Sequence, residues 1–200
     1  MVRLLTKGSS MRSILSLLVL STLLFGCGKK FEPLPPPTAE TIAAFTEAAY
    51  NGNTLAVTEA LQSGMPVDQK ETNGNSGLML AAFNGHVETM QALLDAGANI
   101  NLRDGNDRTA LMFAASGPFP AAVRLLLENG AEINAIDNGE HFTALMFAAG
   151  EGLSPVVDIL LEAGADPTLK DVDDDTAASF AKQRGFSALA DKLQALIDTK

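Results

Sequence analysis

Hydrophobic and polar positions repeat from residue 40 onward with a period of 33 or 34 residues. The period is marked by alanine pairs at 48–49, 81–82, 114–115 and 148–149, and by glycines at 64, 97, 130 and 164. Within one period, Leu78, Ala81 and Ala82 share one face of a short helix, because they stand at i, i+3 and i+4. An apolar stripe over residues 87–94 predicts a second helix, which Gly97 ends. The pattern therefore predicts pairs of helices that bury both faces only when several pairs stack.

Three strings in the middle of the chain align with one another: GLMLAAFNGHVETMQALLDAGANIN, TALMFAASGPFPAAVRLLLENGAEIN and TALMFAAGEGLSPVVDILLEAGADPT. Their period and layout resemble the ankyrin repeat, whose units begin with Thr-Pro-Leu-His. The resemblance implies an all-α solenoid of about five helix-turn-helix repeats with short β-turn fingers over residues 40–200. The expected repeats are 40–70, 71–103, 104–136, 137–170 and 171–200, and the first and last are caps with polar outer faces.

The chain departs from the ankyrin motif at one repeated position. Methionine stands where the motif has histidine, at Met79, Met112 and Met146. We expect this change to remove a hydrogen bond between repeats and to replace it with deformable packing. His86, by contrast, matches the ankyrin Gly-His at the start of the second helix, so the resemblance implies a structural hydrogen bond there.

The first 26 residues have the pattern of an export signal rather than of a repeat. They contain three basic residues and no acidic one, and residues 14–25 form an apolar run. This run is too short to span a bilayer roughly 30 Å thick, which takes ~20 residues. It ends in Leu24-Phe25-Gly26-Cys27, which resembles the lipobox of bacterial lipoproteins. The resemblance implies that residues 1–26 are removed and that Cys27 carries a covalent lipid, and a buried or unmodified thiol is the alternative.

Residues 27–39 are predicted to be the lipidated cysteine and a proline-rich linker. Residues 28–38 hold four of the nine prolines, and Pro35–Pro37 favours polyproline II. We interpret this segment as a stiff spacer, with a PxxP ligand as the alternative. Gly28 stands where an aspartate would favour inner-membrane retention, so the resemblance implies the outer membrane, facing the periplasm. The sequence is compatible with a start at Met1 or at Met11.

Composition narrows the range of partners. The chain is 46% hydrophobic, so it can form a core, and its net charge is −10. Residues 1–26 carry three of the 14 basic residues and none of the 24 acidic ones, so the mature chain has a net charge of −13. Phosphate backbones repel such a chain, and we expect no nucleic-acid partner. Residues 132–175 contain 11 acidic residues and one basic residue, Lys170, which favours a partner with a basic surface over the alternative of a merely solvated face.

The residue types that catalysis needs are scarce. His86 and His141 are the only histidines, and neither has the neighbours of a zinc site. Asp171, Asp173 and Asp175 resemble the start of a calcium loop, but the glycine and glutamate that complete such a loop are absent. We expect no enzyme activity, no metal, no small-molecule substrate and no cofactor besides the covalent lipid. The alternative is an envelope hydrolase with an unrecognised site, which alanine replacement of both histidines tests.

The remaining candidates lie at the turn tips and the ends of the first helices, where ankyrin proteins vary. These positions are Thr72, Asn73, Asn75, Phe83, Asn106, Arg108, Ser116, Glu140, His141, Phe142 and Glu151. Phe83 and Phe142 are the aromatic members, and aromatic side chains often anchor a partner, although packing of Phe83 on its neighbour is an equal alternative. The sequence thus predicts a lipid-anchored envelope protein that binds another protein, either as a scaffold or as an immunity protein against a secreted effector.

Overall fold

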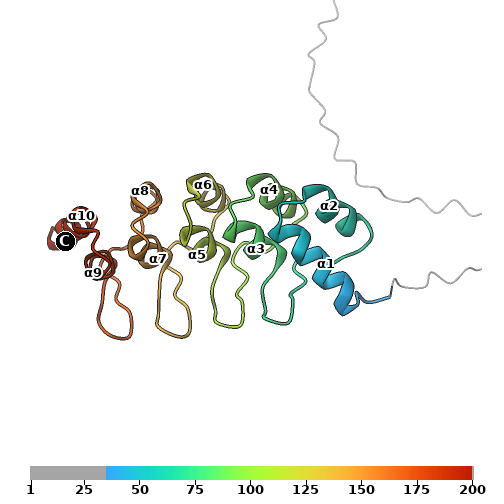
Figure 1. Cartoon of the computed structure of the whole chain (residues 1–200), viewed down its shortest axis with the longest axis horizontal. Helices are drawn as coiled ribbons and strands as arrows, with labels where there is room; N and C mark the ends of the chain where they lie inside the picture. The colour runs from blue at the N-terminus through green and yellow to red at the C-terminus, as the bar shows by residue number, and fades with distance from the viewer. Residues whose placement is uncertain (1–34, 200) are drawn as a thin grey trace, which may run out of the picture. The chain divides into compact units, whose positions relative to one another are not determined.

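A computed structural model describes residues 35–199, which form ten α-helices and no strand (Figure 1). The helices are α1 (Ala39–Tyr50), α2 (Thr54–Gln62), α3 (Gly77–Phe83), α4 (Val87–Asp95), α5 (Ala110–Ala115), α6 (Pro120–Glu128), α7 (Ala144–Gly150), α8 (Ser154–Glu162), α9 (Ala177–Gln183) and α10 (Ser187–Asp198). In this part of the chain, no helix has the length and apolar character needed to cross a membrane. The predicted signal, Cys27 and the linker up to residue 34 lie outside the described residues.

The helices pack in two rows (Figure 1). Helices α1, α3, α5, α7 and α9 form an inner row, and α2, α4, α6 and α8 form an outer row. Each inner helix also packs against the helix that follows it, so that α9 packs against α10. A finger precedes α3, α5, α7 and α9, and antiparallel bridges join Lys70 to Ser76 and Lys170 to Thr176 in the first and last of these fingers. The predicted all-α repeat solenoid is confirmed.

One continuous core runs along the solenoid. Except for the partly buried Ala48, the alanine pairs lie fully buried between inner helices, because only a small side chain lets neighbouring helix backbones approach so closely. Each of the helices α4, α6, α8 and α10 contributes a leucine at the same repeat position, and all four are fully buried: Leu93, Leu126, Leu160 and Leu193. Each repeat therefore completes its core only with the next one.

The inner helices begin at a serine or threonine cap. The Ser76 and Thr143 hydroxyls accept the backbone N–H of Met79 and Met146, at 3.4 and 3.2 Å. In return, each methionine sulfur accepts the backbone N–H of its cap residue at 3.4 Å. Met79 and Met146 thus add a weak hydrogen bond within their own repeat to the expected packing, because the sulfur takes the place that Glu or Gln has in a capping box. Met112 makes no such bond, since its cap residue Thr109 has no side-chain cap hydrogen bond.

A side chain at the start of an outer helix covers the glycine that follows the inner helix of the preceding repeat. Gly52 has a φ of +70° and lies under His86, and Gly85 has a φ of +68° and lies under Phe119. A methyl group on either glycine would overlap the ring above it. His86 Nε2 also lies 3.0 Å from the carbonyl oxygen of Tyr50, so the structural hydrogen bond expected of this histidine is present between the first two repeats.

Candidate functional site

The fingers and the inner helices together form one surface, called here the inner face, which carries two aromatic clusters. In the first, the rings of Tyr50 and Phe83 stack with centroids 6.3 Å apart, and Phe113 meets Phe83 edge-on at 6.2 Å. Tyr50 and Phe83 remain 43% and 41% exposed. The guanidinium carbon of Arg108 lies 4.7 Å from the centroid of Phe113. This cluster is therefore apolar, solvent-exposed and held in place by its own ring contacts.

The second cluster joins the finger before α7 to helices α7 and α9. Phe142 meets Phe147 and Phe180 edge-on, with centroids 5.7 and 5.1 Å apart. Phe113, Phe147 and Phe180 occupy the same position in three successive repeats, immediately before a buried alanine. Sequence reasoning missed these three residues, because an aromatic side chain beside buried alanines is typical of a core position. The sequence feature that could have identified them is their shared position in three successive repeats.

Aspartate carboxylates hold the fingers in shape. The side chain of Asp104 is only 1% exposed, and its carboxylate accepts the backbone N–H groups of Asn106 and Arg108, both at 2.8 Å. The same carboxylate pairs with the Arg108 guanidinium at 2.7 Å. Asp137, at the same position in the next finger, accepts the backbone N–H of Phe142 at 3.0 Å. These carboxylates fix the fingers that carry Arg108 and Phe142.

The aspartates that resemble a calcium loop belong to the same pattern. Asp171 accepts the backbone N–H groups of Asp173 and Asp175, at 2.9 and 2.8 Å. Lys170 pairs with Asp174 at 3.2 Å on the solvent-exposed side of this finger. Within residues 35–199, no three His, Cys, Asp or Glu side chains are grouped so that they could hold a metal ion. This finger is an acidic turn closed by one of its own carboxylates.

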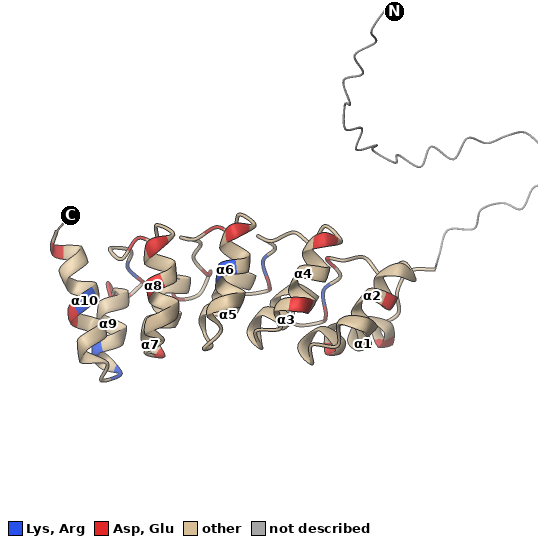
Figure 2. Ribbon diagram, turned by 90° about the horizontal axis from the view of Figure 1, so that it is seen from above, with Lys and Arg blue, Asp and Glu red and all other residues tan. Residues whose placement is uncertain are grey.

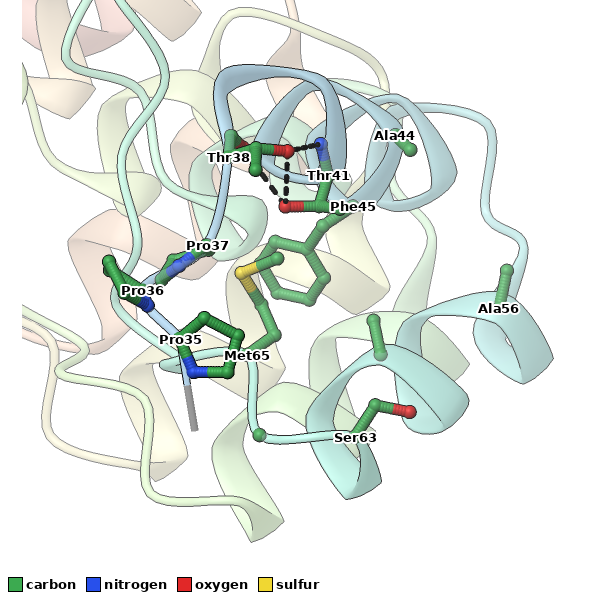
Figure 3. Close-up of a pocket in the computed structure, with 12 residues that line it drawn as sticks. Pro35, Pro36, Pro37, Thr38, Thr41, Ala44, Phe45, Ala56, Ser63 and Met65 are labelled. Carbon is green, nitrogen blue, oxygen red and sulfur yellow. Dashed lines mark hydrogen bonds between the residues drawn. The ribbon is translucent and has the colours of Figure 1, made fainter. Parts of the chain in front are cut away.

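A groove of about 450 Å³ lies at the N-terminal end of the solenoid, between Pro35–Pro37 and the helices α1 and α2 (Figure 3). The Phe45 ring lines it. Thr38 and Thr41 hydrogen-bond to each other, and the Ser63 hydroxyl donates to a carbonyl of its own helix. The groove is apolar in consequence, because its three hydroxyl groups are already engaged within the first repeat.

A family model described as "Ankyrin repeats (3 copies)" matches the chain in three overlapping segments, residues 19–104, 45–137 and 78–171. The chain belongs to the ankyrin-repeat family. No curated protein matches it at a significant level. Ankyrin repeats expose an extended surface that binds other proteins, so the chain is a protein–protein interaction module.

Most of the predicted binding residues lie on the surface of the ankyrin solenoid. Exposed positions are Thr72, Asn73, Phe83, Asn106, Glu140, His141 and Glu151. Half-buried positions are Asn75, Arg108, Ser116 and Phe142. Phe83 packs on its aromatic neighbours and keeps two-fifths of its surface exposed, so its packing is observed and its role as an anchor for a partner stays a prediction.

The half-buried polar residues serve the ankyrin fold itself. Asn75 Nδ2 donates to Glu71 Oε1, and the Ser116 hydroxyl donates to the carbonyl of Phe113, both at 2.8 Å. The structure does not bring the two histidines together, since His86 lies between α3 and α4 and His141 lies in the finger before α7. The exposed aromatic side chains are consequently the strongest feature of the inner face.

Proposed function

We propose that this ankyrin-repeat chain is a lipid-anchored protein of the bacterial envelope that binds another protein through its inner face and performs no catalysis. The single observation that carries the proposed binding role is the aromatic cluster on that face, in which Tyr50 and Phe83 are exposed and pack with half-buried Phe113. Large aromatic side chains kept at the surface of a solenoid lose solvent contact when a partner binds, and such residues dominate interface energies.

The charge of the chain supports a partner with a basic surface. The outer helices α4, α6 and α8 each end in an acidic residue: Asp95, Glu128 and Glu162 (Figure 2). Exposed acids Glu140 and Glu151 also lie in the repeat that carries the second aromatic cluster. An acidic surface speeds the approach of a basic partner and opposes that of an acidic one. The proposed role is either that of a scaffold for an envelope protein or that of an immunity protein against a secreted effector.

Replacing Phe83 by serine tests the inner face. We expect Phe83→Ser to weaken partner binding by about 2 kcal/mol, roughly 30-fold in Kd, because it removes a central aromatic contact. The partner is captured from an envelope extract with residues 28–200, and its affinity is then measured by calorimetry. Leu55→Ser is the matched control, because Leu55 is 68% exposed on the outer helix α2. Equal binding by the Phe83 variant and the wild type would contradict the proposed surface.

The lipid anchor rests on the Leu24-Phe25-Gly26-Cys27 motif. We expect Cys27→Ser to move the protein from the membrane fraction to the soluble fraction, since a covalent lipid with two or more acyl chains is enough for stable anchoring. Gly28→Asp keeps the cysteine, and we expect it to shift the protein to the inner-membrane fraction without releasing it. Cell fractionation with acyl labelling measures both results. A serine variant that stays acylated and membrane-bound would refute the anchor.

A further inference from the structure

A hollow of about 320 Å³ lies on the inner face beside the first aromatic cluster. Its lining comes from three elements: Ala43, Thr46, Glu47 and Tyr50 of α1, Glu71 of the first finger, and Leu80 of α3. The hollow therefore combines an aliphatic side chain, an exposed aromatic ring and two carboxylates. No other repeat carries this combination, because the position of Glu47 is taken by Leu80, Phe113, Phe147 and Phe180 in the repeats that follow.

The two carboxylates have no cation to balance them among the described residues. Glu71 Oε1 accepts one hydrogen bond from Asn75 Nδ2, at 2.8 Å, and Glu47 is exposed. Lys70 immediately precedes Glu71 in the sequence, but its ammonium group donates to the carbonyl of Arg103 in the next finger, at 2.5 Å. The hollow thus holds two negative charges while the adjacent positive charge is directed elsewhere.

Glu71 also differs from its counterparts in the other fingers. The aspartates at this position, Asp104, Asp137 and Asp171, use their carboxylates to hold backbone N–H groups of their own finger. The longer Glu71 side chain instead bonds an amide side chain and lines the hollow. Its carboxylate retains lone pairs that can accept from a ligand.

These groups match a lysine or arginine side chain. The alkyl stem of such a side chain packs on apolar surface while its charged head stays with polar groups, and the lining offers Leu80 for the stem and two glutamates for the head. The Tyr50 ring adds a face that attracts a cation. Because Tyr50 also stacks on Phe83, an apolar residue next to that cation would lie on the exposed rings.

We propose that this hollow receives a lysine or arginine side chain of the protein partner, next to an apolar residue that contacts Tyr50 and Phe83. This inference rests on the proposed function and specifies the chemistry of the partner segment.

Selection of random peptides displayed on phage against the full chain, purified in detergent, tests the proposal. We expect the enriched peptides to contain Lys or Arg beside an aliphatic or aromatic residue. For one such peptide, the double variant Glu47→Gln/Glu71→Gln should weaken binding about tenfold, since desolvated charge pairs contribute at this level. The variant Glu59→Gln/Glu88→Gln makes the same change in charge on the outer helices α2 and α4 and should leave binding unchanged.

A peptide in which norleucine replaces the basic residue completes a double-mutant cycle with the Glu47→Gln/Glu71→Gln variant. The norleucine peptide should bind the wild type about tenfold more weakly than its parent peptide does. The two peptides should bind the Glu47/Glu71 variant with equal affinity, as expected when the basic residue pairs directly with the glutamates. Absence of this coupling, enrichment without basic residues, or no enrichment at all would overturn the inference. If Phe83→Ser still abolishes binding of a non-basic peptide, the inner face remains the binding surface and only the inference fails. If Phe83→Ser has no effect on any selected peptide, the proposed surface fails as well.

Discussion

Replacing Gly85 by alanine is expected to lower the free energy of unfolding by about 3 kcal/mol, since a left-handed backbone and an overpacked contact both add to the cost. Gly85 has a φ of +68°, and a Cβ at this position would lie 2.9 Å from the Cβ of Phe119, too close for any real contact. Rotation of the Phe119 ring does not relieve an overlap with its own Cβ. The substitution therefore forces the second and third repeats apart, and urea unfolding followed by circular dichroism measures the loss.

Gly97→Ala separates the two contributions. Gly97 has a φ of +88°, but a Cβ there meets nothing within 4 Å. We expect this variant to lose only the backbone contribution, about 1 kcal/mol. In a Phe119→Gly background, which removes the Cβ of residue 119 together with the ring, Gly85→Ala should cost no more than Gly97→Ala does. Equal costs for the two glycine variants in the wild-type background would show that the contact between repeats is unimportant.

Replacing Asp104 by alanine is expected to destabilise the protein by about 3 kcal/mol, because removing the buried member of this ion pair leaves two backbone N–H groups unpaired and the half-buried Arg108 without its counter-charge. The Asp104 side chain is 1% exposed and bonds two backbone N–H groups as well as the Arg108 guanidinium. Arg108 in turn lies over the Phe113 ring. The loss of stability should lower the urea midpoint of unfolding. The loss of the Asp104 contact to Arg108 should change the NMR chemical shifts of Phe113.

Asp171→Ala is the matched control for this prediction. Asp171 occupies the same finger position and also holds two backbone N–H groups, but no ion pair involves it among the described residues. We expect a cost of about 1 kcal/mol, since water can replace the lost contacts in a half-buried turn. Equal destabilisation by the two alanine variants would mean that the Arg108 pair contributes nothing.

Much of the fold follows from local patterns. Helix ends at Phe83 and Asp95 match the glycines that come shortly after them, and Pro120 begins α6 as its restricted φ favours. The hydrogen bond expected of His86 is also present. These features depend on a few neighbouring residues and on the repeat period, both of which are visible in the sequence.

The candidate site was only partly predictable. Phe83 was identified from its place at a helix end. Tyr50, which is exposed, and Phe113, Phe147 and Phe180, which are half-buried, were not identified, because the exposed fraction of each ring depends on how neighbouring inner helices pack. Polar residues chosen for their place at turn tips divide into exposed ones and half-buried ones that hold the fingers. The sequence assigns both groups to the same turns, and only the packing separates them.

The sequence by itself determined the repeat architecture and the acidic charge, because both depend only on the residues along the chain. It also predicts an export signal that ends in a motif resembling a lipobox, and this stays a prediction. Tertiary structure alone decided which side chains meet. Glu47 and Glu71 face one hollow although 24 positions separate them, and Gly85 is matched to Phe119 of the next repeat. The physical reason is that stacking converts a period along the chain into contacts between neighbouring repeats. The identity and exposure of those contacts depend on side-chain packing that no single repeat contains.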